Sequence, residues 1–162
     1  MKKPSWMSML AALSLTACAG APPIPGQSQQ EVLARLGKPT AIYRLPNETR
    51  LEYATGPFGQ FTYIAHIGRD GILTSYEQVL TGEKFATIKI GSASKEDVLH
   101  TLGRPGETSY LALPKLEVWS YRYKESGVWD SMMHVHFDAK GIVQMMQNGP
   151  DREREERRSF FQ

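Results

Sequence analysis

Cysteine is almost absent from this sequence of 162 residues, and Cys18 is its one representative. This scarcity excludes an intrachain disulfide and any metal site built from several cysteines. Long apolar stretches are missing as well. The mostly apolar segment 6–15 is shorter than the about 20 residues that a helix needs to cross a bilayer. We therefore expect neither a disulfide scaffold nor a bundle of membrane-spanning helices.

An excess of charge of one sign is also lacking. The formal net charge is +2 at pH 7, and Lys2 and Lys3 account for it, because residues 1–17 contain no acidic side chain. Without these two lysines the 19 basic residues become 17, which equals the 17 acidic residues. A neutral chain has no long-range attraction for a polyanion. We therefore expect no nucleic-acid partner.

The N-terminus has the layout of a secretory signal peptide, in which two lysines precede an apolar segment and then small residues. The segment Leu15–Cys18, with the sequence LTAC, resembles the bacterial lipobox. This resemblance implies cleavage between Ala17 and Cys18 and the attachment of fatty acids such as palmitate to Cys18. Residues 1–17 are thus interpreted as a lipoprotein signal peptide, and the acyl chains would fix the mature protein to a lipid bilayer.

The residues that follow Cys18 indicate to which membrane the protein is sorted and how far its folded part lies from that membrane. Ala19 stands where an aspartate, in bacterial lipoproteins, favours retention in the inner membrane. By the same resemblance we expect the outer membrane of a Gram-negative bacterium, with the protein facing the periplasm. Residues 18–26 are rich in proline and glycine, which predicts a short tether without a core of its own.

One helix pattern occurs twice. Residues 28–39, SQQEVLARLGKP, and residues 94–105, SKEDVLHTLGRP, share serine, valine, leucine, glycine and proline at the same places, 66 residues apart. A serine is a good N-cap, and the apolar spacing forms one stripe on a helix. A glycine suits the turn past a helix end, and proline prevents continuation. The pattern predicts two similar short helices.

Similar strand signals follow each predicted helix. The segments 49–54 and 117–123 alternate between apolar and polar residues, and the turns at 69–71 and 139–141 each contain a glycine between apolar strands. We expect an α+β fold of two tandem units, each with short helices followed by a three-stranded antiparallel sheet. The boundaries that we expect are residues 27–82 for the first unit, residues 83–149 for the second and residues 150–162 for a charged C-terminal tail.

The second unit resembles a known family. The segment 85–105 contains the pattern IGSAS and ends in LGRP, and it is followed by VWSYRY and HFDAKGIV. This order is similar to the SmpA/OmlA (BamE-like) family of outer-membrane lipoproteins. The first unit matches from its helix onward and has APPIPG in place of the preceding short helix. The duplicated arrangement also resembles the fold of the secreted β-lactamase inhibitor protein, which pairs two helix-plus-sheet units.

These resemblances imply a non-catalytic function. We expect a scaffold or binding protein of the cell envelope, acting in outer-membrane assembly or integrity, with another envelope protein as partner and the β-barrel assembly machinery as a candidate. The alternative is an inhibitor of an envelope enzyme. A further alternative is a metal protein or enzyme that uses His134 and His136, which are two apart on a predicted strand and so share a face. We expect no enzyme activity, no cofactor and no metal.

Aromatic residues are the candidate partner-binding side chains. Trp119 and Tyr121 lie on a predicted strand, and Trp129 follows a predicted turn at 125–127. Large aromatic side chains dominate the energetics of many interfaces. Packing within the sheet is the alternative interpretation for all three.

Overall fold

The computed structural model describes residues 21–159, which form four helices and eight strands. The signal peptide, the cleavage site after Ala17 and the lipidation site Cys18 lie outside the described residues. The elements are α1 (Gln29–Leu36), β1 (Ala41–Arg44), β2 (Glu48–Ala54), β3 (Thr62–Gly68), β4 (Leu73–Gln78), α2 (Gly82–Ala86), α3 (Lys95–Leu102), β5 (Glu107–Leu111), β6 (Leu116–Glu125), β7 (Trp129–Phe137), β8 (Val143–Pro150) and α4 (Arg152–Ser159).

The strands form two antiparallel sheets, in the orders β1-β2-β3-β4 and β5-β6-β7-β8. The predicted α+β class is confirmed, but the prediction of three strands per sheet is wrong, since each sheet has four. The additional strands, β1 and β5, directly follow the two repeated helices. β1 has only four residues, of which the first three are apolar or aromatic, and all five residues of β5 are exposed. Neither sequence therefore shows the alternation of apolar and polar residues by which a half-buried strand is recognised.

Both repeated helices form as predicted, and each begins with a capping box. Ser28 and Glu31 exchange side-chain and backbone hydrogen bonds at the start of α1. Ser94 and Asp97 do the same at the start of α3. Each pair satisfies backbone amides that have no partner inside the helix. The pKa of Asp97 lies below its ordinary value because the Ser94 backbone amide and hydroxyl donate to its carboxylate.

The two units correspond beyond the helices. Tyr53 in β2 donates its hydroxyl hydrogen to the carbonyl of Gly37, at 3.4 Å, and Tyr121 in β6 does the same to Gly103, at 3.2 Å. Both glycines have φ of +77°. A β-bulge interrupts the pairing of β3 with β4, and another interrupts β7 with β8. The same tertiary bonds therefore recur in both halves of the described chain.

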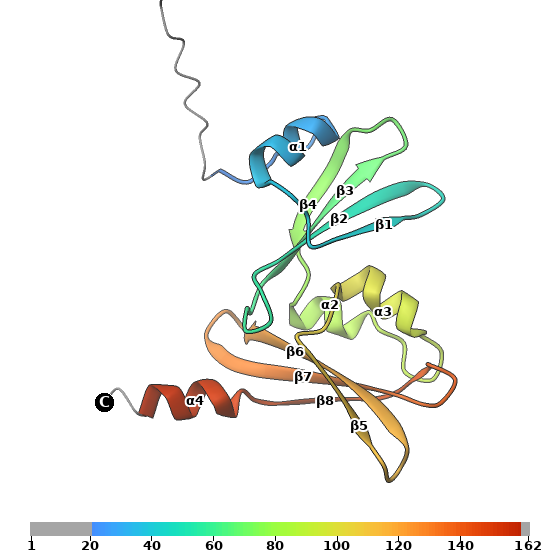
Figure 1. The fold of residues 1–162 in the computed structure, drawn as a ribbon, viewed down its shortest axis with the longest axis vertical. Helices are drawn as coiled ribbons and strands as arrows, with labels where there is room; N and C mark the ends of the chain where they lie inside the picture. Colours follow the sequence, from blue (N-terminus) through green and yellow to red (C-terminus); the bar gives the residue numbers. More distant parts are fainter. Residues whose placement is uncertain (1–20, 160–162) are drawn as a thin grey trace, which may run out of the picture.

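The elements stack in four layers, namely α1, the first sheet, the α2–α3 pair and the second sheet (Figure 1). Helix α1 packs on one face of the first sheet through a small core around Val32 and Leu51. The larger core lies around α2 and α3, and it combines residues of the second sheet with Ile64, Val79 and Leu80 of the first unit. The helices α2 and α3 thus lie between the two sheets and bury Phe85, Val98 and Leu102 there.

A buried carboxylate joins the layers. Glu52 in β2 is only 1% exposed. One of its oxygens accepts a hydrogen bond from the Tyr43 hydroxyl, at 2.6 Å, and another from the backbone amide of Arg104, at 3.0 Å. The other oxygen accepts from the Thr40 hydroxyl, at 3.0 Å. Because Arg104 follows directly after α3, this carboxylate holds the end of a helix of the second unit on the first sheet.

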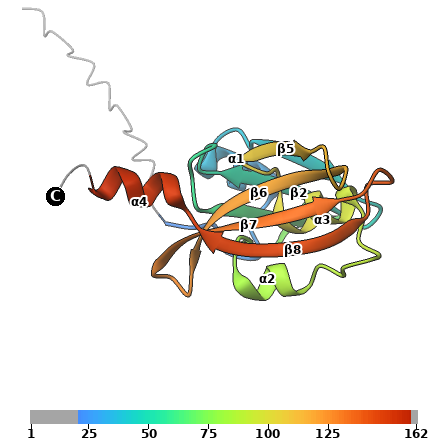
Figure 2. The same cartoon turned by 90° about the horizontal axis from the view of Figure 1, so that it is seen from below.

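The charged tail forms α4, which continues past the end of β8 (Figure 2). Glu153 and Arg157, which are four residues apart on this helix, form an ion pair at 2.6 Å. Across residues 21–159, no helix has the length and apolar character needed to cross a membrane.

Gly37 and Gly103, the glycines that follow α1 and α3, provide a matched test of the contact between Glu52 and the end of α3. Their φ of +77° is combined with ψ of −157° and −165°, a region that only glycine adopts readily. We expect Gly37→Ala to lower the free energy of unfolding by about 2 kcal/mol through this strain alone. Gly103→Ala should cost about 2 kcal/mol more, because its added Cβ would lie 2.8 Å from Oε2 of Glu52, whereas that of Gly37 meets nothing within 4 Å.

Urea unfolding of both variants measures this difference. If both variants lost the same free energy of unfolding, the contact between Glu52 and the end of α3 would be less closely packed than the structure indicates.

Candidate functional site on the open face of the second sheet

The middle strand β6 presents two different faces because successive side chains on a strand alternate. Trp119, Tyr121 and Tyr123 belong to the core that surrounds α2 and α3. Ser120 and Arg122 therefore point to the opposite face. Seen from below, β5 to β8 lie in front and no helix crosses them (Figure 2). We call this uncovered side of the second sheet the open face.

The open face has a polar centre with apolar neighbours. The register places Arg122 opposite Met132, Ser120 opposite His134, and Val118 opposite His136. Paired residues of antiparallel strands share a face, so these side chains form a continuous surface. Its further members, from the flanking strands, are Glu107 of β5 and Met145 and Gln147 of β8.

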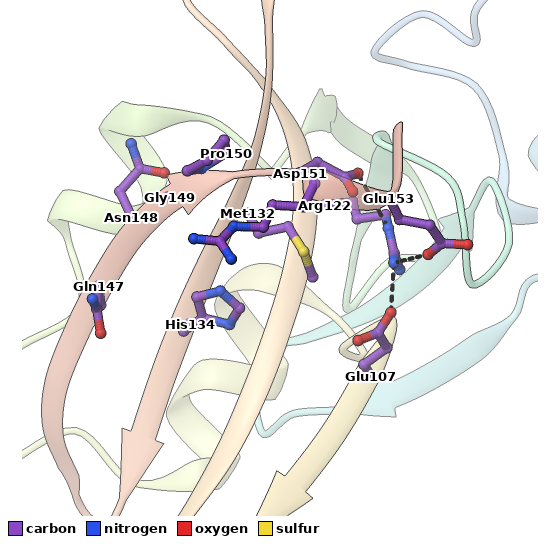
Figure 3. A pocket seen from close by; sticks show the side chains of 11 residues that line it. Glu107, Arg122, Met132, His134, Gln147, Asn148, Gly149, Pro150, Asp151 and Glu153 are labelled. Atoms are coloured by element: carbon purple, nitrogen blue, oxygen red, sulfur yellow. Dashed lines mark hydrogen bonds and ion pairs between the residues drawn. The ribbon is translucent and has the colours of Figure 1, made fainter. Parts of the chain in front are cut away.

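Arg122 is the centre of a charge cluster at one end of the open face (Figure 3). Its guanidinium nitrogens lie 2.6 Å from Glu107, 2.7 Å from Glu153 and 3.2 Å from Asp151. The Arg122 side chain is 4% exposed and that of Asp151 is fully buried, whereas Glu107 and Glu153 are about half exposed. A hollow of about 610 Å³ lies beside this cluster. Arg154 also lies 3.5 Å from Asp151 and Arg157 lies 2.6 Å from Glu153, so the three carboxylates are balanced by three arginines.

The cluster also reaches the first unit. Arg122 donates to the carbonyl of Pro57, at 3.3 Å, and its guanidinium lies 5.3 Å from the centre of the Phe58 ring. The Phe58 carbonyl also accepts a hydrogen bond from Arg154 of α4. The second sheet, α4 and the loop between β2 and β3 are therefore held together at one corner of the open face.

Two histidines lie next to each other along β7 on the open face, as their spacing predicted. Nδ1 of His134 lies 2.8 Å from the Ser120 hydroxyl. His136 is 5% exposed, and neither of its ring nitrogens has a hydrogen-bond partner. Burial lowers the pKa of His134, against the opposing effect of the Glu107 charge. Burial and then the neighbouring His134 lower the pKa of His136.

The pairing of Ser120 with His134 brings a hydroxyl and an imidazole together, as serine hydrolases do. However, Ser120 lies in a middle strand, where the backbone amides are used in pairing with the strands on both sides. An oxyanion site needs free donors beside the nucleophile. In residues 21–159, no group of three or more His, Cys, Asp or Glu side chains has the geometry to hold a metal.

The structure does not bring the three predicted partner-binding aromatics together. Trp119 and Tyr121 are 8% and 1% exposed and lie in the core. In this conformation they pack against α2 and α3 and present no surface to a partner. Trp129 is 69% exposed at the start of β7, and its role as a partner-binding residue stays a prediction.

Sequence reasoning missed Arg122, Asp151 and the special position of His136. A signal for Arg122 was present in WSYRY, where an arginine alternates with aromatic residues on a strand. Asp151 follows directly after β8, and no local pattern distinguishes it from the other acids of the tail.

Comparison with known proteins adds little. No protein family model matches the chain, and no curated protein matches it. Among solved structures, it is similar to YjgB of Bacillus subtilis, a DUF4309 family protein, with 14% sequence identity. The similarity covers 76% of this chain and 78% of that chain with a TM-score of 0.34, and we base no argument on it.

The Arg122 cluster predicts a large effect on stability. Arg122→Ala should lower the free energy of unfolding by about 3–5 kcal/mol, because it leaves the buried Asp151 carboxylate without its main counter-charge. Adding Asp151→Asn should recover at least half of this loss. Arg44→Ala, at an exposed position on β1, is the control and should change stability by less than about 0.5 kcal/mol. Denaturant unfolding measures all of these variants, and a loss in Arg122→Ala no larger than in the control would contradict the assignment.

The two histidines predict a pH dependence of stability. In the unfolded chain their pKa is about 6.5, and in the folded chain the pKa of both is lower. As the pH falls, the unfolded state therefore binds protons first. The contribution to stability is complete above about pH 7 and is lost as the pH falls through 6.5 towards the lowered values. Urea unfolding between pH 7.5 and 5.5 should show this decline, and a His134→Gln/His136→Gln variant that keeps the same slope would refute its origin.

Proposed function

We propose that this chain is a lipoprotein attached through Cys18 to the outer membrane of a Gram-negative bacterium. There it faces the periplasm and acts as a non-catalytic scaffold that binds another envelope protein in outer-membrane assembly or integrity. The observation that carries the binding role is the open face of the second sheet, because the equivalent face of the first sheet is already used to bind two helices. Within residues 21–159, only α4 and the loop between β2 and β3 contact this face, at the corner of Arg122, so the rest of it can receive a partner.

The family assignment is part of this proposal. The resemblance to the SmpA/OmlA (BamE-like) family rests on segment 85–105 and the strands that follow it. The order of elements agrees with this resemblance. A short helix precedes a second helix, which is followed by GRP, and an antiparallel sheet of hairpins comes next. The paired units resemble the β-lactamase-inhibitor-like arrangement at the level of element order. We therefore infer a relative of these lipoproteins whose repeat unit is doubled.

The start of the folded part supports a short tether. The backbone amide of Gly26 donates to the carbonyl of Leu73, at 2.9 Å, and is thereby bound to the first sheet. Gly26 lies eight positions after Cys18, which allows a reach of about 25 Å when extended. A lipid on Cys18 would keep the two stacked units close to the membrane surface.

The anchor is tested by Cys18→Ser. We expect the wild type to incorporate radiolabelled palmitate and to sediment with outer membranes, and the variant to lose the label and to appear in the periplasmic fraction. The physical reason is that several acyl chains, at about 0.8 kcal/mol per buried CH₂, are replaced by a hydroxyl.

Ala19→Asp is the matched control for this experiment. It should keep the label and move the protein to the inner membrane fraction. A Cys18→Ser protein that stays with the outer membrane would exclude the lipid anchor.

A further inference from the structure

The hairpin between β6 and β7 is longer than its counterpart in the first unit. Tyr53 and Tyr121 hold equivalent positions, since each bonds to the glycine that follows the preceding helix. β2 ends one residue after Tyr53, at Ala54, whereas β6 continues for four residues after Tyr121, to Glu125. The returning strand β7 begins with Trp129, which pairs with Glu125. The second unit therefore carries a hairpin extension that the first unit lacks.

This extension is bonded to the body of the protein. Asp130 is 9% exposed, and its carboxylate accepts a hydrogen bond from Gln60 of the first unit, at 2.6 Å. The same carboxylate pairs with Lys124, at 2.7 Å, and Lys124 also donates to the carbonyl of Val128 in the turn. The end of the hairpin is thus fixed in position, although Val128 and Trp129 belong to neither of the two cores.

A hollow of about 380 Å³ lies beside this hairpin, and Trp129 forms part of its wall. The end of β8 and the side chain of Glu155 in α4 complete the wall. Trp129 is 69% exposed, and its neighbour Val128 is 64% exposed. Within residues 21–159, no aromatic ring and no cation packs on the indole. A large aromatic side chain that is free beside a hollow is suited to a protein contact.

The Glu125 carboxylate borders the same hollow and is held there by neutral groups. It accepts hydrogen bonds from the Ser131 hydroxyl, at 2.7 Å, and from the Asn148 side-chain amide, at 2.8 Å. These two bonds lower the pKa of Glu125, so it is ionised at neutral pH. Within the described residues no basic side chain forms an ion pair with it. Since a carboxylate can accept about four hydrogen bonds, Glu125 can accept further ones.

The charge around the hollow indicates what it binds. Asp130 is neutralised by Lys124, but Glu125 and Glu155 form no ion pair within residues 21–159, and no basic side chain lines the hollow. The face of an indole is also negative and attracts a cation. Arginine fits better than lysine, because its planar guanidinium stacks on a ring while its nitrogens donate to a carboxylate.

The protein already contains this combination once. The guanidinium of Arg157 lies 5.4 Å from the centre of the Phe58 ring and 2.6 Å from the Glu153 carboxylate. An aromatic ring and a carboxylate thus hold one guanidinium between them. At the hollow the ring and the carboxylate are present, and no described residue supplies the guanidinium.

We propose that the hollow beside the β6–β7 hairpin binds an arginine side chain of the envelope protein that this chain recognises. The guanidinium stacks on the Trp129 ring and donates to the Glu125 carboxylate, while Val128 packs against the same segment of the partner. This inference rests on the proposed function and names the side chain by which the partner is held. Tryptophan and arginine are among the residues that contribute most to the affinity of protein interfaces.

Site-specific photocrosslinking in cells tests the location. A photoreactive residue replaces Val128 in the full-length chain. The matched control is the same replacement at Ile90, which is 58% exposed between α2 and α3. We expect at least ten times more crosslinked protein from Val128 than from Ile90. Mass spectrometry of the product should place the crosslink in a segment of the partner that contains an arginine.

Two substitutions of Trp129 separate stacking from a general apolar contact. Trp129→Phe keeps an aromatic face and should retain crosslinking from Val128 within twofold. Trp129→Leu keeps an apolar side chain without a ring and should lower crosslinking at least fivefold. Because Trp129 is exposed, both variants should melt within about 3 °C of the wild type. Loss of crosslinking at an unchanged melting temperature is then a loss of contact and not of folding.

An exchange of charges tests the ion pair. Glu125→Arg should abolish crosslinking, because it places a positive charge opposite the arginine of the partner. Replacing that arginine of the partner by glutamate should restore at least a third of the wild-type yield in the Glu125→Arg strain. Glu96→Arg, at an acid on α3 that is 80% exposed, is the control and should leave the yield unchanged.

Several results would overturn the proposal. They are equal crosslinking from Val128 and Ile90, crosslinks only to lipid or to a second copy of the chain, a crosslinked segment without an arginine, equal yields from the two Trp129 variants, or no recovery after the exchange of charges. Membrane fractionation of the same strains reads the lipid anchor independently. Retained attachment with failed crosslinking would refute the arginine site alone, and crosslinking with failed attachment would refute the anchor alone.

Discussion

The hydrogen bonds of the Glu52 carboxylate determine how the two units are arranged. A buried charge is costly unless donors surround it, and here the donors come from both units. Thr40 and Tyr43 belong to the first sheet, and the Arg104 amide belongs to the end of α3. Because α3 also packs against the second sheet, the same contact sets the position of the second sheet relative to the first.

The core of the second unit depends on this arrangement. Ile64, Val79 and Leu80 of the first unit complete the core formed by α2, α3 and the second sheet. A four-stranded sheet with two short helices buries little apolar surface by itself. Stacking lets one helix layer contact a sheet on each of its two sides, and within residues 21–159 it leaves the second sheet with one face that no helix layer covers.

Local sequence signals predicted the two repeated helices, whereas long-range packing decided which faces of the sheets are covered. The capping serines and the glycines after each helix act within a few residues, so α1 and α3 were readable from the sequence. Alternation showed that Trp119 and Tyr121 share a face, but it did not show that α2 and α3 would cover that face. The burial of His136 without a hydrogen-bond partner was not predictable, because no local pattern in the sequence distinguishes it from His134.

Electrostatic contacts hold α4 at one corner of the open face. Seven of the eight residues of α4 are charged, so it has no apolar stripe that would hold it on a core. Its position instead follows from the ion pairs of Arg122 with Asp151 and Glu153, and from the hydrogen bond of Arg154 to Phe58. Since these contacts fix α4 at the end of β8, that corner is closed.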